Sequence, residues 1–246
     1  MPLEGAPAPL PERAAALNAA LRGHGATSVI ERALADPLVG DIALVSSFGA
    51  ESIALLHLVA AVDRTVPVVF LETGMLFPET LDYQAGVAER LGLADLRIVR
   101  PGDLSGDPDG TLHRTDADAC CALRKAAPLA GALEPFDAWF TGRKRYQGGR
   151  RAALEFFEAA DGRLKVNPLA RWDPADVQDY VANNGLPRHP LVARGYPSIG
   201  CAPCTTPVAP GEDPRAGRWR GSAKDECGIH FENGRVVRGP ARRTAA

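Results

Sequence analysis

Short apolar runs alternate with helical patterns through the middle of the chain. Four of these runs predict strands, at residues 41–47, 66–73, 96–101 and 137–142, and the first of them indicates a buried strand. Three stretches between them predict helices, at residues 51–62, 78–92 and 119–133. Because alternating strands and helices assemble through right-handed crossovers, we expect an α/β fold: a twisted parallel sheet with helices on both faces and a ligand site at the carboxyl ends of its strands.

The composition divides the chain into three parts. Residues 1–38 form an N-terminal helical segment, and residues 39–184 carry the alternating pattern of an α/β domain. Repeated prolines between residues 185 and 246 interrupt any long element, so we expect a loop-rich C-terminal tail that folds back over the sheet. These prolines are Pro187, Pro190, Pro197, Pro203, Pro207, Pro210 and Pro214.

The overall composition is that of a globular protein. Hydrophobic residues make up 46% of the 246 positions and charged residues 24%, with a formal net charge of −2. This balance gives no general attraction for polyanions, so we do not expect a nucleic-acid partner. No apolar run is long enough for a membrane span, and the first residues do not resemble a signal peptide, so we expect a cytoplasmic protein. Whether it forms a homo-oligomer is left open.

A loop between the first strand and its helix is a candidate anion site. It contains Ser46, Ser47, Phe48 and Gly49, where backbone N–H groups and the helix dipole favour negative charge. The alternative is that Gly49 serves only an ordinary strand-to-helix turn, where a single Gly is common. The loop is neither a Walker loop nor a dinucleotide fingerprint. It resembles the loop of ATP pyrophosphatase-like (adenine nucleotide alpha hydrolase-like) folds, in the variant of enzymes that bind an adenylate without cleaving ATP.

Four of the five cysteines fall into two pairs. Cys120 and Cys121 are adjacent, and Cys201 and Cys204 are two residues apart. In a reducing compartment such pairs indicate a zinc site or an iron–sulfur cluster, and the second pair also suits a redox dithiol. Adjacent helical positions point about 100° apart, which fits one small ion poorly and favours a cluster.

Two further residues have candidate roles beside these pairs. Lys125 follows Cys121 by four residues, so it shares that ligand's helical face and would offset part of a cluster's negative charge. A solvated surface lysine is the alternative. Cys227 lies near the end of the chain with His230 close by, which could hold it as a reactive thiolate. A buried, unreactive cysteine is the alternative there.

Together these motifs resemble one family. The loop SSFGAES, the cysteine pair with its lysine, and the segments GYPSIGCAPCTTPV, GEDPRAGRWRG and KDECGIH are similar to the assimilatory adenylyl-sulfate (APS) reductases, the cluster-bearing and thioredoxin-dependent branch of the APS/PAPS reductases. The resemblance covers roughly residues 40–232. It implies an enzyme that converts adenylyl sulfate to sulfite and AMP.

The resemblance also implies roles for individual residues. Cys227 would be the nucleophile. Lys144 occupies a position where the family usually has an arginine. Its ammonium cannot make the bidentate contact of a guanidinium, so the resemblance implies an arginine contact for Arg145 alone. The implied 4Fe–4S ligands are Cys120, Cys121, Cys201 and Cys204. The implied substrate contacts are Ser46, Ser47, Phe48, Gly49, Lys125, Arg145, Arg215, Arg218 and His230.

The implied chemistry agrees with these residue types. The Cys227 thiolate would attack the sulfate sulfur and expel AMP, leaving an S-sulfocysteine, while cations reduce the repulsion between two anions. Thioredoxin or a similar dithiol protein would then release sulfite.

Three alternatives remain. A PAPS reductase would act on a 3'-phosphorylated substrate by the same route. An ATP-dependent tRNA thiolation enzyme would share the fold, but the altered loop disfavours it. A metal-binding module without catalysis would leave Cys227 without a role.

Overall fold

The computed structural model of the chain describes residues 8–221, 224, 231–232 and 235–236. A six-stranded sheet runs through the middle of the molecule, in the order β3-β2-β1-β4-β6-β5. Neighbouring strands are parallel, except that β5 at one edge runs antiparallel to β6. The strands are β1 (Ile42–Ser46), β2 (Val68–Leu71), β3 (Leu96–Val99), β4 (Ala138–Phe140), β5 (Phe157–Ala160) and β6 (Arg163–Val166).

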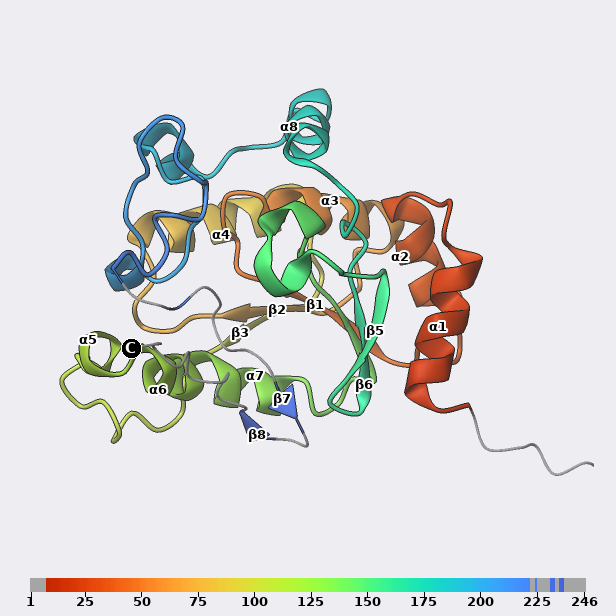
Figure 1. The fold of residues 1–246 in the computed structure, drawn as a ribbon, viewed down its shortest axis with the longest axis horizontal. Coiled ribbons are helices and arrows are strands. Elements are labelled where there is room, and N and C mark those ends of the chain that lie inside the picture. Colours follow the sequence, from red (N-terminus) through yellow and green to blue (C-terminus); the bar gives the residue numbers. More distant parts are fainter. Residues whose placement is uncertain (1–7, 222–223, 225–230, 233–234, 237–246) are drawn as a thin grey trace, which may run out of the picture.

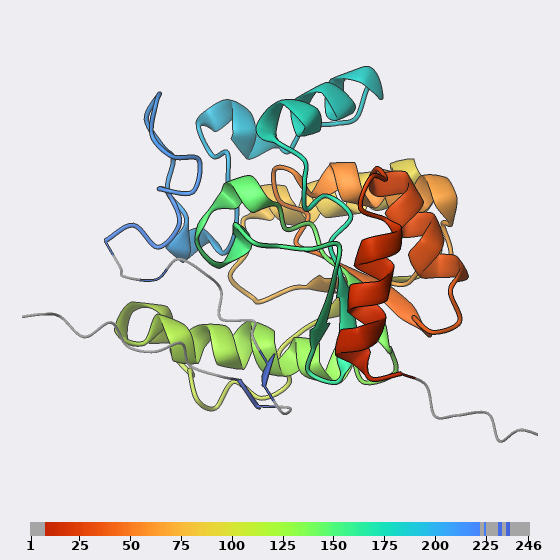
Figure 2. The same cartoon turned by 45° about the vertical axis from the view of Figure 1, so that its right-hand side comes forward.

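Helices cover both faces of this sheet, as the sequence predicts (Figures 1 and 2). One face carries α3 and α4, with α2 and α8 packed against α3; the other carries α5 to α7, and α1 packs on β5. The helices are α1 (Leu10–Ala20), α2 (Ala26–Ala35), α3 (Ser52–Val62), α4 (Pro78–Leu91), α5 (Leu112–Thr115), α6 (Ala117–Cys121), α7 (Ala127–Ala132) and α8 (Pro174–Asn183).

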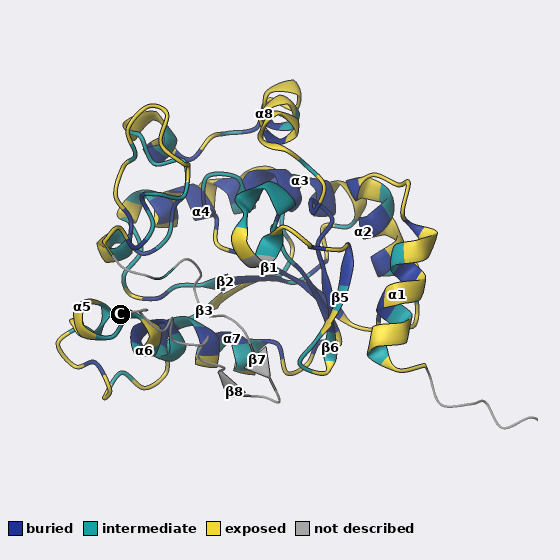
Figure 3. Cartoon of the chain, in the orientation of Figure 1, coloured by how far each residue is buried: buried dark blue, intermediate teal, exposed yellow. Residues whose placement is uncertain are grey.

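Each face has its own hydrophobic core, because successive side chains of a strand point to opposite faces. The larger core contains Leu44, Phe70 and Phe140 together with most of α3, whose side chains are buried almost all round (Figure 3). The smaller core joins Trp139 on β4 to Leu129 on α7 and their neighbours. No helix among the described residues is long and apolar enough to cross a bilayer.

Two elements differ from the sequence-based expectation. The predicted helix at 119–133 is continuous, but its middle, Ala122–Ala126, is a π-helix between α6 and α7. The hairpin of β5 and β6 was not predicted. Its strands are joined by a two-residue turn, Asp161–Gly162, with φ of 54° and 74°, which is the geometry of a tight hairpin.

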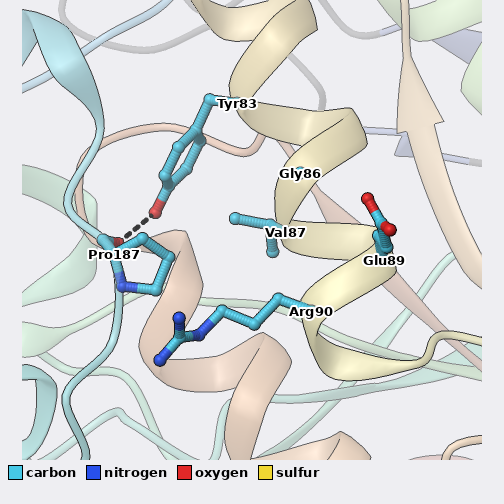
Figure 4. A pocket seen from close by; sticks show the side chains of 6 residues that line it. All are labelled: Tyr83, Gly86, Val87, Glu89, Arg90 and Pro187. Atoms are coloured by element: carbon cyan, nitrogen blue, oxygen red, sulfur yellow. Dashed lines mark hydrogen bonds between the residues drawn. The ribbon is translucent and has the colours of Figure 1, made fainter.

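Beyond residue 185 the described chain has only short elements. These are the 3-10 helices η4 (Pro190–Arg194) and η5 (Ala202–Cys204) and the paired strands β7 (Phe231–Glu232) and β8 (Arg235–Val236). The segment is anchored to α4 by Tyr83, whose hydroxyl donates to the carbonyl of Pro187 at 2.8 Å. Figure 4 shows this contact at the edge of a cavity of about 440 Å³ lined by Tyr83, Gly86, Val87, Glu89, Arg90 and Pro187.

The same segment then crosses the carboxyl edge of the sheet. Cys201 forms an isolated antiparallel bridge with Leu76, and the N–H of Ala202 donates to the carbonyl of Met75 at 2.7 Å. A Cβ atom at Gly49 would lie 3.3 Å from the carbonyl oxygen of Ile199. The first part of the predicted tail is therefore seated directly against the loop that follows β1.

Candidate functional site

The strand order places a cavity at a predictable point. From β1 the chain moves outward through β2 to β3, then returns to the opposite side of β1 as β4. In α/β sheets, ligands bind where the order reverses, outside the carboxyl ends of the strands. A cavity of about 600 Å³ lies there, within the size range of small-molecule sites. Its walls come from residues 46–52, 141–151 and 197–219 and from the side chains of Lys125, Trp139 and Lys165.

The loop after β1 presents backbone donors to this cavity. The N–H groups of Phe48 and Gly49 donate to the hydroxyls of Ser46 and Ser52, at 3.2 and 3.0 Å. The following N–H groups, of Ala50 and Glu51, have no acceptor among the residues that the structure describes, and both residues line the cavity. Free N–H groups at the start of the eleven-residue helix α3 favour an anion.

Glu51 ties this loop to the one that follows β4. Its carboxylate accepts hydrogen bonds from Lys144 at 2.9 Å, from Gln147 at 3.3 Å and from the hydroxyl of Tyr146. Lys144 is only 2% exposed, and its ammonium also donates to the carbonyl of Gly142 at 3.1 Å. Burial lowers the pKa of Lys144, while the neighbouring carboxylate opposes that shift.

Cations dominate the rest of the lining. Arg143 is held by Glu158 and by Asn167, the latter at 3.0 Å, and Arg218 donates to the carbonyl of Ile199 at 3.3 Å. Among the residues that the structure describes, the carboxylates that line the cavity are only those of Glu51 and Asp213, so an anionic ligand is favoured. The basic residues of the lining are Lys125, Arg143, Lys144, Arg151, Lys165, Arg215 and Arg218.

The four described cysteines lie next to segments that line this cavity, since Gly200 directly precedes Cys201 and Lys125 follows Cys121 by four residues, and they form no disulfide. Cys120, Cys121 and Cys201 are buried, and Cys204 is half-buried. Burial raises the pKa of Cys120, and the nearby thiolates of Cys201 and Cys204 raise it further, while Arg124 lowers it. Three of the thiols therefore interact electrostatically.

No three His, Cys, Asp or Glu side chains in the described part of the chain lie close enough together to hold a single metal ion.

A buried ion pair supports the cysteines. Arg124, in the π-helix, donates to Asp107 at 2.8 Å and to the carbonyl of Thr73 at 3.0 Å. The hydroxyl of Thr73 lies 3.3 Å from the sulfur of Cys201. The π-helix, the loop after β2 and the second cysteine pair are thus joined through one arginine and one threonine.

A family model described as the phosphoadenosine phosphosulfate reductase domain matches residues 41–207, which include the loop after β1 and all four described cysteines. The chain belongs to this reductase family. An adenosine 5'-phosphosulfate reductase of Mesorhizobium japonicum is 51% identical over 223 residues, covering 89% of this chain and 87% of the relative. One of Chelativorans sp. is 55% identical over 195 residues, covering 78% and 80%.

A solved structure of the same family agrees with the fold. The phosphoadenylyl-sulfate reductase of Candida auris superposes with a TM-score of 0.70 at 26% identity, over 82% of this chain and 100% of that chain. The expected α/β architecture and the family resemblance are both confirmed.

In this member of the reductase family, the structure brings most of the predicted substrate contacts together. Ser46, Ser47, Gly49, Lys125, Arg215 and Arg218 all line the cavity. Cys227 and His230 lie outside the described residues. The last described residue before Cys227 is Lys224, whose ammonium pairs with Asp118 of α6, two residues before Cys120.

Two predicted contacts are placed elsewhere. The Phe48 side chain is completely buried and packs edge-to-face on Phe70, with ring centroids 5.2 Å apart. Its φ of +47° turns the ring into the core, so only its backbone belongs to the loop. Arg145 donates to the carbonyl of Leu154 at 2.6 Å and to Glu155 at 2.9 Å, which directs its guanidinium away from the cavity.

The sequence analysis also missed residues that do line the cavity, among them Glu51, Arg151 and Lys165. Glu51 and Arg151 gave no distinctive local signal. Lys165 did: it is a charged residue between Leu164 and Val166 in a buried strand, where an unpaired lysine is uncommon.

Proposed function

We propose that this reductase converts adenylyl sulfate to sulfite and AMP. The single observation that carries the proposal is the cavity at the strand-order reversal, which joins the anion-favouring start of α3 to a cationic wall that includes Lys125, Arg215 and Arg218. The two relatives described above, at 51% and 55% identity, are named for reduction of this substrate.

Substrate binding follows from the charges of the cavity. Ala50 and Glu51 offer backbone N–H groups to a phosphate, and Lys125, Arg215 and Arg218 offer cations to the adjoining sulfate. The phosphosulfate is an anion that must approach a second anion, the attacking thiolate. Positive charge arranged in advance lowers that repulsion and stabilises the charge that develops on the leaving phosphate.

Cys227 supplies the nucleophile in this proposal. Its thiolate forms a bond to the sulfate sulfur, the bond from that sulfur to the phosphate oxygen breaks, and AMP leaves with the electron pair. His230 and the neighbouring arginines hold the thiol in its charged form. The product on the protein is S-sulfocysteine.

A dithiol protein such as thioredoxin completes the cycle. One of its thiolates attacks the Cys227 sulfur and displaces sulfite, forming a mixed disulfide, and its second thiol resolves that disulfide and leaves the partner oxidised. Such a partner operates in the cytoplasm, where thiols are kept reduced, and this location suits the absence of disulfides among the described cysteines.

We also propose that Cys120, Cys121, Cys201 and Cys204 hold a 4Fe–4S cluster. The donor set fits: four thiols with no disulfide, three of which interact electrostatically, beside the cation Arg124. A cluster spreads its irons over several Å and so tolerates thiols that are too far apart for one ion. When bound, it would supply a fixed negative charge and a structural link between α6 and the segment at residues 201–204.

Trapping of the intermediate tests substrate, mechanism and residue together. The anaerobic protein is incubated with ³⁵S-labelled adenylyl sulfate without reductant, and its peptides are analysed by mass spectrometry. We expect one SO₃ adduct, on Cys227, and release of sulfite and AMP when a dithiol is added. Cys227→Ser should form no adduct and keep its visible absorbance. An adduct on another cysteine, or full activity of Cys227→Ser, would overturn the assignment.

A PAPS reductase is the second candidate, because the structural relative from Candida auris is named for that substrate. It would follow the same steps on a nucleotide with an added 3'-phosphate. A comparison of kcat/KM for the two nucleotides at equal ionic strength decides between them. We expect adenylyl sulfate to be the better substrate.

A further inference from the structure

Lys165 is placed in the cavity by the register of the sheet. On β6 it pairs with Trp139 of β4, and both side chains point toward the α7 face, whereas Leu164 and Val166 point into the larger core. Its ammonium lies 4.9 Å from the centroid of the Trp139 ring. The residue is only 8% exposed and lines the cavity, so what remains accessible faces the ligand space.

This ammonium has no anionic partner within the described part of the chain. Lys144 pairs with Glu51 and Lys224 with Asp118, but Lys165 makes no ion pair or hydrogen bond there. The charged groups around it are Arg143 and Arg151, which oppose its positive charge, and Glu158 and Asp161, which favour it. Glu158 is already engaged by Arg143 and Asn167.

A buried cation without a counter-ion is costly, and the Trp139 ring offsets only part of that cost. Burial lowers the pKa of Lys165 to about 8, with Arg143 adding to the shift. The side chain is therefore largely protonated at neutral pH. An anion that enters the cavity would restore the missing negative charge and raise this pKa.

We propose that Lys165 is a further substrate-binding residue, whose ammonium binds the phosphosulfate group of the nucleotide on the Trp139 side of the cavity. The identity of this anion as a phosphosulfate depends on the proposed function. The presence of an anion site at Lys165 does not depend on it. The phosphate and the sulfate are the two negative groups of that substrate, and comparison of AMP with adenylyl sulfate distinguishes them.

The first test measures binding without turnover. AMP and adenylyl sulfate are titrated calorimetrically into the anaerobic Cys227→Ser protein, with and without Lys165→Met or Lys165→Arg. If the ammonium holds the phosphate, we expect Lys165→Met to weaken the binding of AMP at least tenfold. If it holds the sulfate, only the binding of adenylyl sulfate should weaken by that factor. Lys165→Arg keeps the positive charge, so its dissociation constants for both nucleotides should stay within about threefold of those of the protein with Lys165. Unchanged binding of both nucleotides to Lys165→Met would overturn the proposal.

A matched control exists on the same face of the sheet. Arg97 on β3 places its guanidinium 5.1 Å from the Phe136 ring, outside the cavity. Arg97→Met removes a cation from an aromatic ring as Lys165→Met does, but should leave both affinities unchanged.

The pH dependence adds a readout that loss of structure would not produce. As pH rises through about 8, Lys165 loses its proton in the free protein, so affinity for the anion should fall. With Lys165→Arg this fall should be smaller, leaving only the part due to other groups of the cavity such as Lys144, whose pKa burial also lowers. An identical decline in both proteins would contradict the role of Lys165.

A second test uses the unaltered protein. The chain has four lysines, Lys125, Lys144, Lys165 and Lys224, so each can be followed by peptide mass spectrometry. During reductive methylation at pH 8, AMP should slow the labelling of Lys165 at least fivefold, whereas adenosine, which lacks the anion, should not. Equal labelling with and without AMP would overturn the proposal whether or not the protein forms sulfite, which separates it from the proposed function.

Discussion

At the residue scale, one carboxylate sets the shape of the cavity. Glu51 directly precedes α3 and binds Lys144, Tyr146 and Gln147, so it joins two loops that lie more than ninety residues apart in the sequence. Lys144 is almost completely buried, which makes the pair sensitive to loss of either partner.

We expect Glu51→Gln to lower the free energy of unfolding by about 1–3 kcal/mol, because it leaves the buried Lys144 ammonium without a counter-ion. Urea denaturation at pH 7 measures this change. The double variant Glu51→Gln with Lys144→Met should regain part of the loss, since both charges are then gone. A single variant within 0.5 kcal/mol of the wild type would show that the pair does not hold the loops together.

Which individual residues reach the cavity was predictable only in part. Lys125 and the arginines at 215 and 218 were found by their motifs and do line it. The choice between Lys144 and Arg145 was not predictable, because side-chain direction in an irregular loop depends on distant partners. Here Leu154 and Glu155 turn Arg145 outward.

At the scale of elements, His189 fixes η4 against α4. Its Nδ1 accepts the N–H of Leu191 at 3.2 Å, so the proton of the neutral ring is on Nε2, which donates to Thr80 at 3.0 Å. Burial lowers the pKa of His189 to about 4, although Glu79 opposes the shift. Protonation of Nδ1 would break the bond to Leu191.

This environment predicts a loss of stability in acid. Because the folded-state pKa lies below the ordinary value of 6.5, the unfolded chain takes up a proton first as pH falls. The free energy of unfolding should therefore decline between pH 6.5 and about 4, by at most about 1.4 kcal/mol per pH unit from this group.

Urea denaturation from pH 8 to 4.5 measures that slope. His57, whose pKa is also lowered by burial, contributes in the same direction. The difference between wild type and His189→Gln isolates the contribution of His189, since Gln keeps a donor toward Thr80 but does not titrate. Parallel curves for the two proteins would contradict the prediction.

The elements themselves were largely predictable. The four strands and three helices of the alternating pattern appear where the sequence places them. Most of them bury an apolar surface of the right period, but β3 has no buried residue and is held by its pairing with β2. The β5–β6 hairpin was missed although Asp161–Gly162 is a strong turn signal between alternating residues. The π-helix was not predictable, since nothing in Ala122–Ala126 distinguishes it from an α-helix.

At the scale of the whole molecule, the cysteine pairs come from segments about eighty residues apart. α6 carries one pair below the sheet, and the segment beyond η4 carries the other across its edge (Figure 1). A group that binds both pairs would add a direct link between these segments to the contacts made through Arg124 and Thr73.

We expect the anaerobically purified protein to be brown, with about four irons per chain. Cys121→Ser should lose the visible absorbance and its iron and have a lower Tm, because the link between the two segments is lost. Absorbance, iron analysis and calorimetry measure these changes. Colourless protein with one zinc per chain, or full iron content in Cys121→Ser, would exclude the proposed cluster.

The close approach of Ile199 to Gly49 has a further consequence. A nucleotide in the cavity touches the rigid sheet on one side and, on the other, a stretch built from turns and short 3-10 helices. A bound nucleotide would stabilise this stretch against local unfolding. We therefore expect AMP to slow amide hydrogen exchange most in residues 197–219, whereas exchange in the strands beneath, which are already protected, should change little.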